Sequence, residues 1–173
     1  MRKTAILLVL MIFSARLILA TSYSGPVKQT VHSSDGKYFA VIDPAHVVQN
    51  VYRSSGQPKI YWSFSFTPEM DKWFVPDNGE FVVCIRWRFV RTEDLEKPAV
   101  IIFYRDGSIK KHSYNSLVKA RRTGLFETAP EGSFWRVWYE SLSIKNNSIE
   151  ISTHSETRIV ITGEHGKLDI YRD

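Results

Sequence analysis

The sequence contains a single cysteine, Cys84, so no disulfide can form within the chain. It also lacks a Gly-x-Ser-x-Gly element, which positions the nucleophile of α/β-hydrolases. No glycine-rich phosphate loop is present, because the 9 glycines all stand singly. Cys84 lies in the apolar run 81–85, which predicts a buried thiol rather than a nucleophile. Packing and hydrogen bonds alone must therefore hold the fold together.

Residues with metal-binding or acid–base chemistry are present, but none has a diagnostic spacing. The 5 histidines are His32, His46, His112, His154 and His165. His154 and Glu156 would share one face of a strand, and Asp43 and His46 place an acid close to a base. A metal site needs several ligands in a defined geometry, and no carboxylate pair for glycoside hydrolysis is identifiable. We therefore predict no catalytic residue, no metal ion and no cofactor.

The first 22 residues have the three parts of a secretory signal peptide. Two basic residues follow the initial methionine, residues 5–13 are apolar, and residues 20–22 (Ala-Thr-Ser) offer a small-x-small cleavage site. The apolar run is shorter than the roughly 20 residues that cross a bilayer. We predict cleavage after residue 22 and export of residues 23–173 as a single domain, to the periplasm or the extracellular space.

Arg16 supports one alternative, because it interrupts the apolar stretch of the signal. Residues 4–20 would then form an uncleaved membrane anchor. In that anchor the guanidinium group would lie inside the bilayer, at a cost of roughly 2.5–3.5 kcal/mol unless it snorkels to the surface. A lipoprotein is disfavoured, because the only cysteine of the chain does not follow the apolar run.

The predicted signal accounts for most of the apparent basicity of the chain. The formal charge of +5 falls to +2 without residues 1–22, which hold three basic residues and no acid. So small a surplus does not predict a nucleic-acid partner, which would call for a clustered basic patch. The basic groups at 86–88, 110–111 and 119–122 are spread out. We interpret them as solvated faces, with an acidic partner as the alternative, and expect membrane contact only through the N-terminal signal.

The composition of the predicted domain favours strands, because Val, Ile, Tyr, Phe and Trp suit half-buried pleated surfaces. Turn signals separate the strand candidates. The predicted strands cover residues 38–42, 60–66, 81–90, 100–104, 108–113, 134–140, 148–153, 158–162 and 167–171. Asp106-Gly107 predicts a tight primed hairpin turn. One short helix is expected near residues 116–123, with Asn115 or Ser116 as its cap and Gly124 as its stop.

Two segments form a weak internal repeat. Residues 35–42 (DGKYFAVI) and 78–85 (NGEFVVCI) each consist of a turn, a charged residue, an aromatic residue and an apolar strand. Gly36 and Gly79 lie 43 residues apart, and propeller blades repeat at about 40–45 residues. This pattern resembles small exported proteins of unknown function with propeller-like, WD-like strand repeats, and the resemblance implies no catalytic residues. The predicted fold class is all-β, with antiparallel sheets in an open stack of propeller-blade-like units or a sandwich.

Aromatic residues are the candidates for ligand binding. Flat indole rings stack on sugars, and exposed Trp also marks protein contacts, whereas core packing is the alternative for each of them. Trp135 and Trp138 have opposite parity, so both cannot face the core of one regular strand. The candidate binding residues are Trp62, Trp73, Trp135 and Trp138.

These observations favour a non-enzymatic exported binding or structural module that acts through a sheet face or loop surface. Its partner would be a protein or an envelope glycan. A secreted or periplasmic hydrolase is one alternative, and it requires a pocket with two acids or an acid and a histidine. A small inhibitor of a foreign hydrolase is another, and it requires a protruding loop at residues 91–98 or 124–132. An open stack would also leave sheet edges that invite pairing with another chain.

Overall fold

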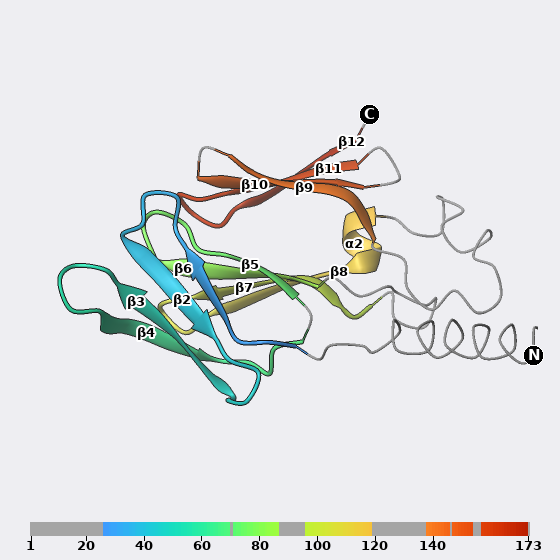
Figure 1. The fold of residues 1–173 in the computed structure, drawn as a ribbon. Coiled ribbons are helices and arrows are strands. Elements are labelled where there is room, and N and C mark those ends of the chain that lie inside the picture. The colour runs from blue at the N-terminus through green and yellow to red at the C-terminus, as the bar shows by residue number, and fades with distance from the viewer. Residues whose placement is uncertain are drawn as a thin grey trace, which may run out of the picture.

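The computed structural model describes residues 26–69, 71–86, 96–118, 138–145, 147–153 and 157–172. These residues form three four-stranded antiparallel sheets and one short helix, which confirms the all-β prediction (Figure 1). Sheet A consists of β1 (Gln29–His32), β2 (Tyr38–Ile42), β3 (Val48–Arg53) and β4 (Lys59–Ser65), in that order. Sheet B consists of β5 (Asp71–Phe74), β6 (Phe81–Arg86), β7 (Pro98–Tyr104) and β8 (Ile109–Ser113). Sheet C consists of β9 (Tyr139–Lys145), β10 (Ser148–Thr153), β11 (Thr157–Thr162) and β12 (Leu168–Arg172).

The three sheets are stacked, with sheet B between sheets A and C (Figure 1). Both faces of sheet B are buried, because successive side chains of a strand point to opposite sides. Val82 and Cys84 of β6 face sheet A, whereas Val83 and Ile85 face sheet C. Each outer sheet buries only one face, as in the alternation of β10, where Ile149 is buried and its neighbours are partly exposed. The stack therefore has two separate apolar cores.

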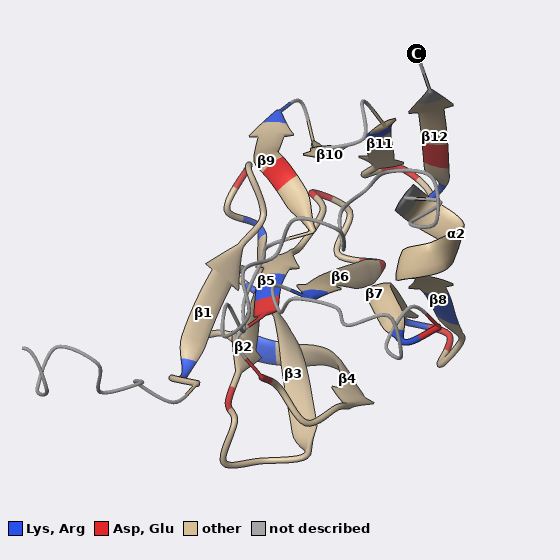
Figure 2. Cartoon of the chain, turned by 90° about the vertical axis from the view of Figure 1, so that its right-hand side faces the viewer, with Lys and Arg blue, Asp and Glu red and all other residues tan. Residues whose placement is uncertain are grey.

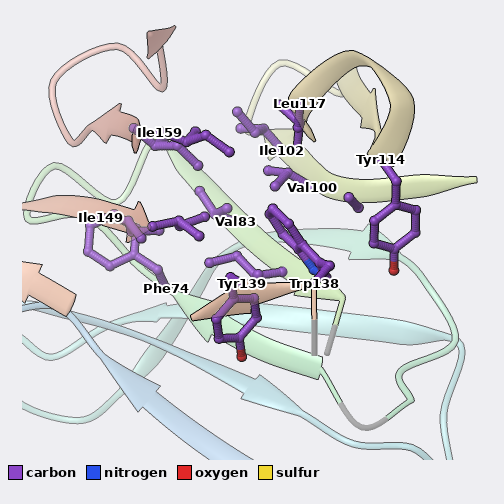
Figure 3. Close-up of a cluster of buried hydrophobic side chains, with 14 of the residues drawn as sticks. Phe74, Val83, Val100, Ile102, Tyr114, Leu117, Trp138, Tyr139, Ile149 and Ile159 are labelled. Atoms are coloured by element: carbon purple, nitrogen blue, oxygen red, sulfur yellow. The ribbon is translucent and has the colours of Figure 1, made fainter. Parts of the chain in front are cut away.

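The core between sheets B and C also takes in the helix α2 (Tyr114–Val118) (Figure 3). Leu117 is fully buried against this core, and Tyr114 lies beside Trp138. The helix begins earlier than predicted, because Ser113 supplies the cap: its hydroxyl accepts the N–H of Ser116 at 3.2 Å. Residues 119–123 of the predicted helix lie outside the described part of the chain.

Hydrogen bonds between turns fix the three sheets relative to one another at one end. In each sheet the first two strands are joined by a short turn that carries a positive φ, at Gly36, Gly79 and Asn147. The N–H of Asp35 donates to a carboxylate oxygen of Asp77 at 3.0 Å, and the N–H of Asp77 donates to Oδ1 of Asn147 at 2.8 Å. The repeat seen in the sequence thus marks equivalent turns of sheets A and B, and Asn147 occupies the same place in sheet C.

Gly79 lies in close contact with two residues of sheet A. A Cβ at this position would lie 2.4 Å from a ring carbon of Tyr38, and the indole N–H of Trp62 donates to the Gly79 carbonyl at 2.7 Å. The equivalent Gly36 has nearly the same φ, 70° against 65°, but open space around it. A substitution at Gly36 therefore measures the cost of backbone strain alone, whereas the same substitution at Gly79 adds the cost of a steric clash.

Gly36→Ala should lower the free energy of unfolding by about 1–2 kcal/mol, the cost of placing a Cβ in the left-handed region. Gly79→Ala should lose a further 1–3 kcal/mol or so, because the Tyr38 ring must also move. Urea unfolding of both variants measures the difference. Equal losses would show that the contact between the sheets at Gly79 does not constrain the fold.

Candidate functional site

Three of the four candidate tryptophans are buried. Trp62 and Trp73 lie between sheets A and B with 8% and 6% of their surface exposed, and Trp138 lies between sheets B and C with 3% exposed. The Trp138 indole donates to the carbonyl of Arg86 at 2.6 Å, and its ring meets that of Tyr139 edge-on (Figure 3). These indoles pack in the core and present no flat face to a ligand. Trp135 lies outside the described residues, so its binding role stays a prediction.

A groove of about 310 Å³ lies between the last strands of sheets A and B. Its lining residues come from β3, β4, β7 and the turn into β8: Val48, Ser63, Phe64, Ser65, Phe103, Tyr104, Gly107, Ser108 and Ile109. The first strands of the two sheets, β1 and β5, contact each other. The two sheets thus meet at their first strands and leave the groove between β4 and β8.

The groove follows the free edge of β4. Within the described chain β4 pairs only with β3, so its other edge has no partner strand. Ser63, Phe64 and Ser65 all line the groove although they are consecutive. Consecutive side chains point to opposite faces of a sheet, so a groove that touches all three must run along the backbone edge of the strand.

The groove has an aromatic floor and an apolar rim. The rings of Phe64 and Phe103 stack with centroids 4.6 Å apart, and both side chains are buried. At the rim, Val48 and Ile109 remain 53% and 51% exposed. Apolar side chains exposed on either side of a groove are typical of a binding surface, because they gain by being covered.

The turn that joins β7 to β8 forms one wall of the groove. The sequence prediction of a hairpin at this position is confirmed, but only Gly107 has a positive φ, whereas a type I′ turn needs two such residues. The N–H of Ser108 donates to Oδ1 of Asp106 at 2.8 Å and its hydroxyl donates to the same atom at 2.6 Å. These bonds lower the pKa of Asp106 and fix the turn beside the groove.

A second hydrogen-bonded cluster joins the same turn to sheet A. The guanidinium of Arg105 lies 4.1 Å from the centre of the Tyr61 ring and forms an ion pair with Glu80 at 3.1 Å. The Tyr61 hydroxyl donates to Glu80 at 2.7 Å, and this bond raises the pKa of the tyrosine. The cluster ties β4 to the β7–β8 turn, so both sides of the groove are held in place.

The described lining of the groove contains hydroxyl groups but no acid and no histidine. Besides the Ser108–Asp106 bond, the Ser63 hydroxyl donates to Oδ1 of Asn50 at 2.7 Å. A serine nucleophile needs an adjacent base that accepts its proton, commonly a histidine.

A buried charged cluster lies between sheets A and B and was not found from the sequence. Asp71 has 4% of its surface exposed, pairs with Arg86 at 3.4 Å, and has one carboxylate oxygen without a hydrogen-bond partner. Burial raises the pKa of Asp71, against the opposing effect of Arg86. Cys84 is buried as predicted, and burial raises the pKa of its thiol. No three potential metal ligands cluster anywhere in the described part of the chain.

The fold is that of an open stack of three blade-like sheets, and comparisons with known proteins add only a general likeness. No family model and no curated protein matches the chain. Kluyveromyces marxianus Hsv2 is similar in structure, with 10% identity over 88% of this chain and 46% of Hsv2, and a TM-score of 0.41. The Pseudomonas aeruginosa periplasmic gluconolactonase PpgL is also similar, with 18% identity over 86% of this chain and 41% of PpgL, and a TM-score of 0.37.

A Bacteroides fragilis protein described as a 6-phosphogluconolactonase has 13% identity over 82% of this chain and 36% of its own, with a TM-score of 0.41. The chain thus spans less than half the length of each of these three proteins.

Among the residues described here, no helix is both long and apolar enough to cross a bilayer.

The raised pKa of Asp71 predicts how stability depends on pH. As pH rises above the usual value of 3.8, the unfolded chain releases this proton before the folded protein does, so stability from this group declines. Asp71→Asn removes that decline. The variant should therefore gain stability relative to the wild type as pH rises above about 4, as measured by urea unfolding.

Asp35 supplies a control of opposite sign. Its pKa is lowered to about 2, mainly by its hydrogen bonds to Lys37, so its stabilising effect is lost as pH falls from 3.8 to about 2. Asp35→Asn should lose stability relative to the wild type as pH rises through that window. A stability difference for Asp71→Asn that does not change with pH would contradict the assignment of a buried carboxyl with a raised pKa.

Proposed function

We propose that the protein is a non-enzymatic binding module that holds an extended polypeptide segment along the free edge of β4. The observation that carries this proposal is the position of Ser63, Phe64 and Ser65, three consecutive edge residues that line one groove. An unpaired edge presents a row of N–H and C=O groups that another strand can satisfy. Partners that add a strand to a sheet gain affinity from these backbone bonds and specificity from pockets for alternate side chains.

The size of the groove supports a polypeptide over a small molecule. At about 310 Å³ it stands at the lower end of the range of roughly 300–1,000 Å³ for small-molecule sites. A space of this size suits one or two side chains of a longer ligand. Val48 and Ile109 at the rim and Phe64 and Phe103 in the floor offer an apolar pocket for such an anchor.

We propose that this binding takes place outside the cytoplasm, in the periplasm or the extracellular space, with a protein of the envelope or of the surroundings as the partner. The support for the location is the signal-like pattern of residues 1–22. The hydrolase alternative gains no support from the groove, whose described lining has no acid and no histidine. Most of the loops considered for an inhibitor, residues 91–98 and 124–132, lie outside the described residues.

Selection from a phage-displayed library of random peptides tests the proposal. Peptides enriched on the wild-type protein should bind the Ile109→Asp variant at least about tenfold more weakly, because a charge at the rim must lose its water when the groove is covered. The matched control is Ile144→Asp. Ile144 is similarly exposed, 47% against 51%, but lies on β9 of sheet C.

Binding of the enriched peptides to the wild type and to Ile144→Asp should be equal, and circular dichroism should show that both variants are folded. Enriched peptides that bind Ile109→Asp as well as the wild type would place their site elsewhere. Failure to enrich any peptide would contradict a polypeptide-binding role.

A further inference from the structure

Resting on the proposed function, we infer that the polypeptide held along β4 is acidic, with carboxylates at alternate positions between apolar residues. The groove combines an apolar pocket with edge strands that carry positive charge only. The side chains of an extended segment alternate between its two sides. Placed between β4 and β8, such a segment would direct one set of side chains to the apolar pocket and the other set to the positive charges.

The charges on the two edge strands have one sign. The sequence of β4 is KIYWSFS and that of β8 is IKKHS, so together they hold Lys59, Lys110 and Lys111 and no acid. The basic residues of β8 are blue in Figure 2. All three lysines are exposed, and none forms an ion pair with a described residue, although Lys110 lies 5.1 Å from the centre of the Tyr104 ring.

The strand register places one of these lysines on the groove side of sheet B. Ile109 pairs with Phe103, and Lys111 pairs with Ile101. Phe103 and Ile101 belong to the core between sheets A and B, so Ile109 and Lys111 share the face that looks toward sheet A. Ile109 already lines the groove. Lys111 therefore lies on the same side, two residues further along β8.

Two acids lie beside these strands, one in contact with Tyr61 of β4 and one in the turn before β8, and both are already engaged. Glu80 accepts from Tyr61 and is paired with Arg105, and Asp106 accepts two hydrogen bonds from Ser108. His112, the remaining titratable group of β8, has its pKa lowered by burial and by Lys110, which keeps it neutral near pH 7. No described group on β4 or β8 therefore offsets the three lysines.

Lysines on an edge strand also prevent unwanted pairing with other chains, and this role is consistent with the proposal. Lys110 and Lys111 disfavour pairing of another strand with the edge of β8, whereas the last residues of β4, from Ser63 to Ser65, are uncharged. The same positive charge repels a basic strand and attracts an acidic one. The lysines thus direct the added strand to β4 and select its charge.

Three nine-residue peptides test this inference. They share Val at every second position and carry Glu, Ser or Lys at the others. Fluorescence anisotropy at low ionic strength should rank their affinities for the wild type as Glu, then Ser, then Lys. The preference for Glu over Lys should shrink as salt is added, because exposed charges are screened.

Charge reversal identifies the residues that cause the preference. In the double variant Lys110→Glu, Lys111→Glu the affinity for the Glu peptide should fall at least about fivefold, and that for the Lys peptide should rise. This is the effect expected when the charge pair at Lys111 is reversed and the positive charge of Lys110 on the same strand is lost. The matched control is Lys72→Glu, Lys145→Glu, which reverses two exposed lysines on β5 and β9. The control should keep the wild-type order.

The outcomes separate this inference from the proposed function. If the Ser and Glu peptides bind equally and Ile109→Asp weakens both, the groove binds strands without regard to charge, and the inference is overturned while the function stands. If the Glu preference survives the β8 double variant, other charges cause it, and the inference is overturned. If none of the peptides binds and the library selection also fails, both proposals fall together.

Discussion

Sheet B has two apolar faces, and the rest of the molecule is arranged to cover them. Burial of a large apolar surface is the dominant favourable term in folding, so this sheet needs a neighbour on each side. Sheets A and C supply those neighbours, and each then exposes its own outer face. The fold contains no disulfide, because Cys84 is the only cysteine and is buried in one of the two cores.

The constraint on the middle sheet also produces the candidate site. The linked turns of Asp35, Asp77 and Asn147 hold the three sheets at one end, and the contact of β1 with β5 holds sheets A and B at their first strands. Within the described chain, their last strands, β4 and β8, have free edges with the groove between them. A stack that does not close on itself thus leaves an edge available for another chain, and the Arg105–Tyr61 contact keeps that edge in position.

The sequence alone predicted the fold class, the repeated turns and the β7–β8 hairpin, because each has a strong local signal in alternation or in glycine. It missed β1, β3 and β5 and all but the first two residues of β9. Polar residues such as Gln29, Asn50 and Lys72 weaken the apolar pattern of these strands, whose stability comes from pairing with neighbouring strands. It also placed the binding role on tryptophans, three of which serve the cores. The groove has no sequence motif, since it arises from two edges brought together by stacking. The one sequence-based expectation that bears on the groove is that an open stack leaves sheet edges able to pair with another chain.

The central claim is that the edge of β4 accepts a strand, and residue-resolved amide hydrogen exchange tests it most directly. In the free protein, the β4 amides that point away from β3 have no described partner and should exchange quickly. On binding of a groove-dependent peptide, those amides around residues 63–65 should become protected, because the added strand satisfies them. Unchanged exchange in β4 alongside protection elsewhere would contradict the account.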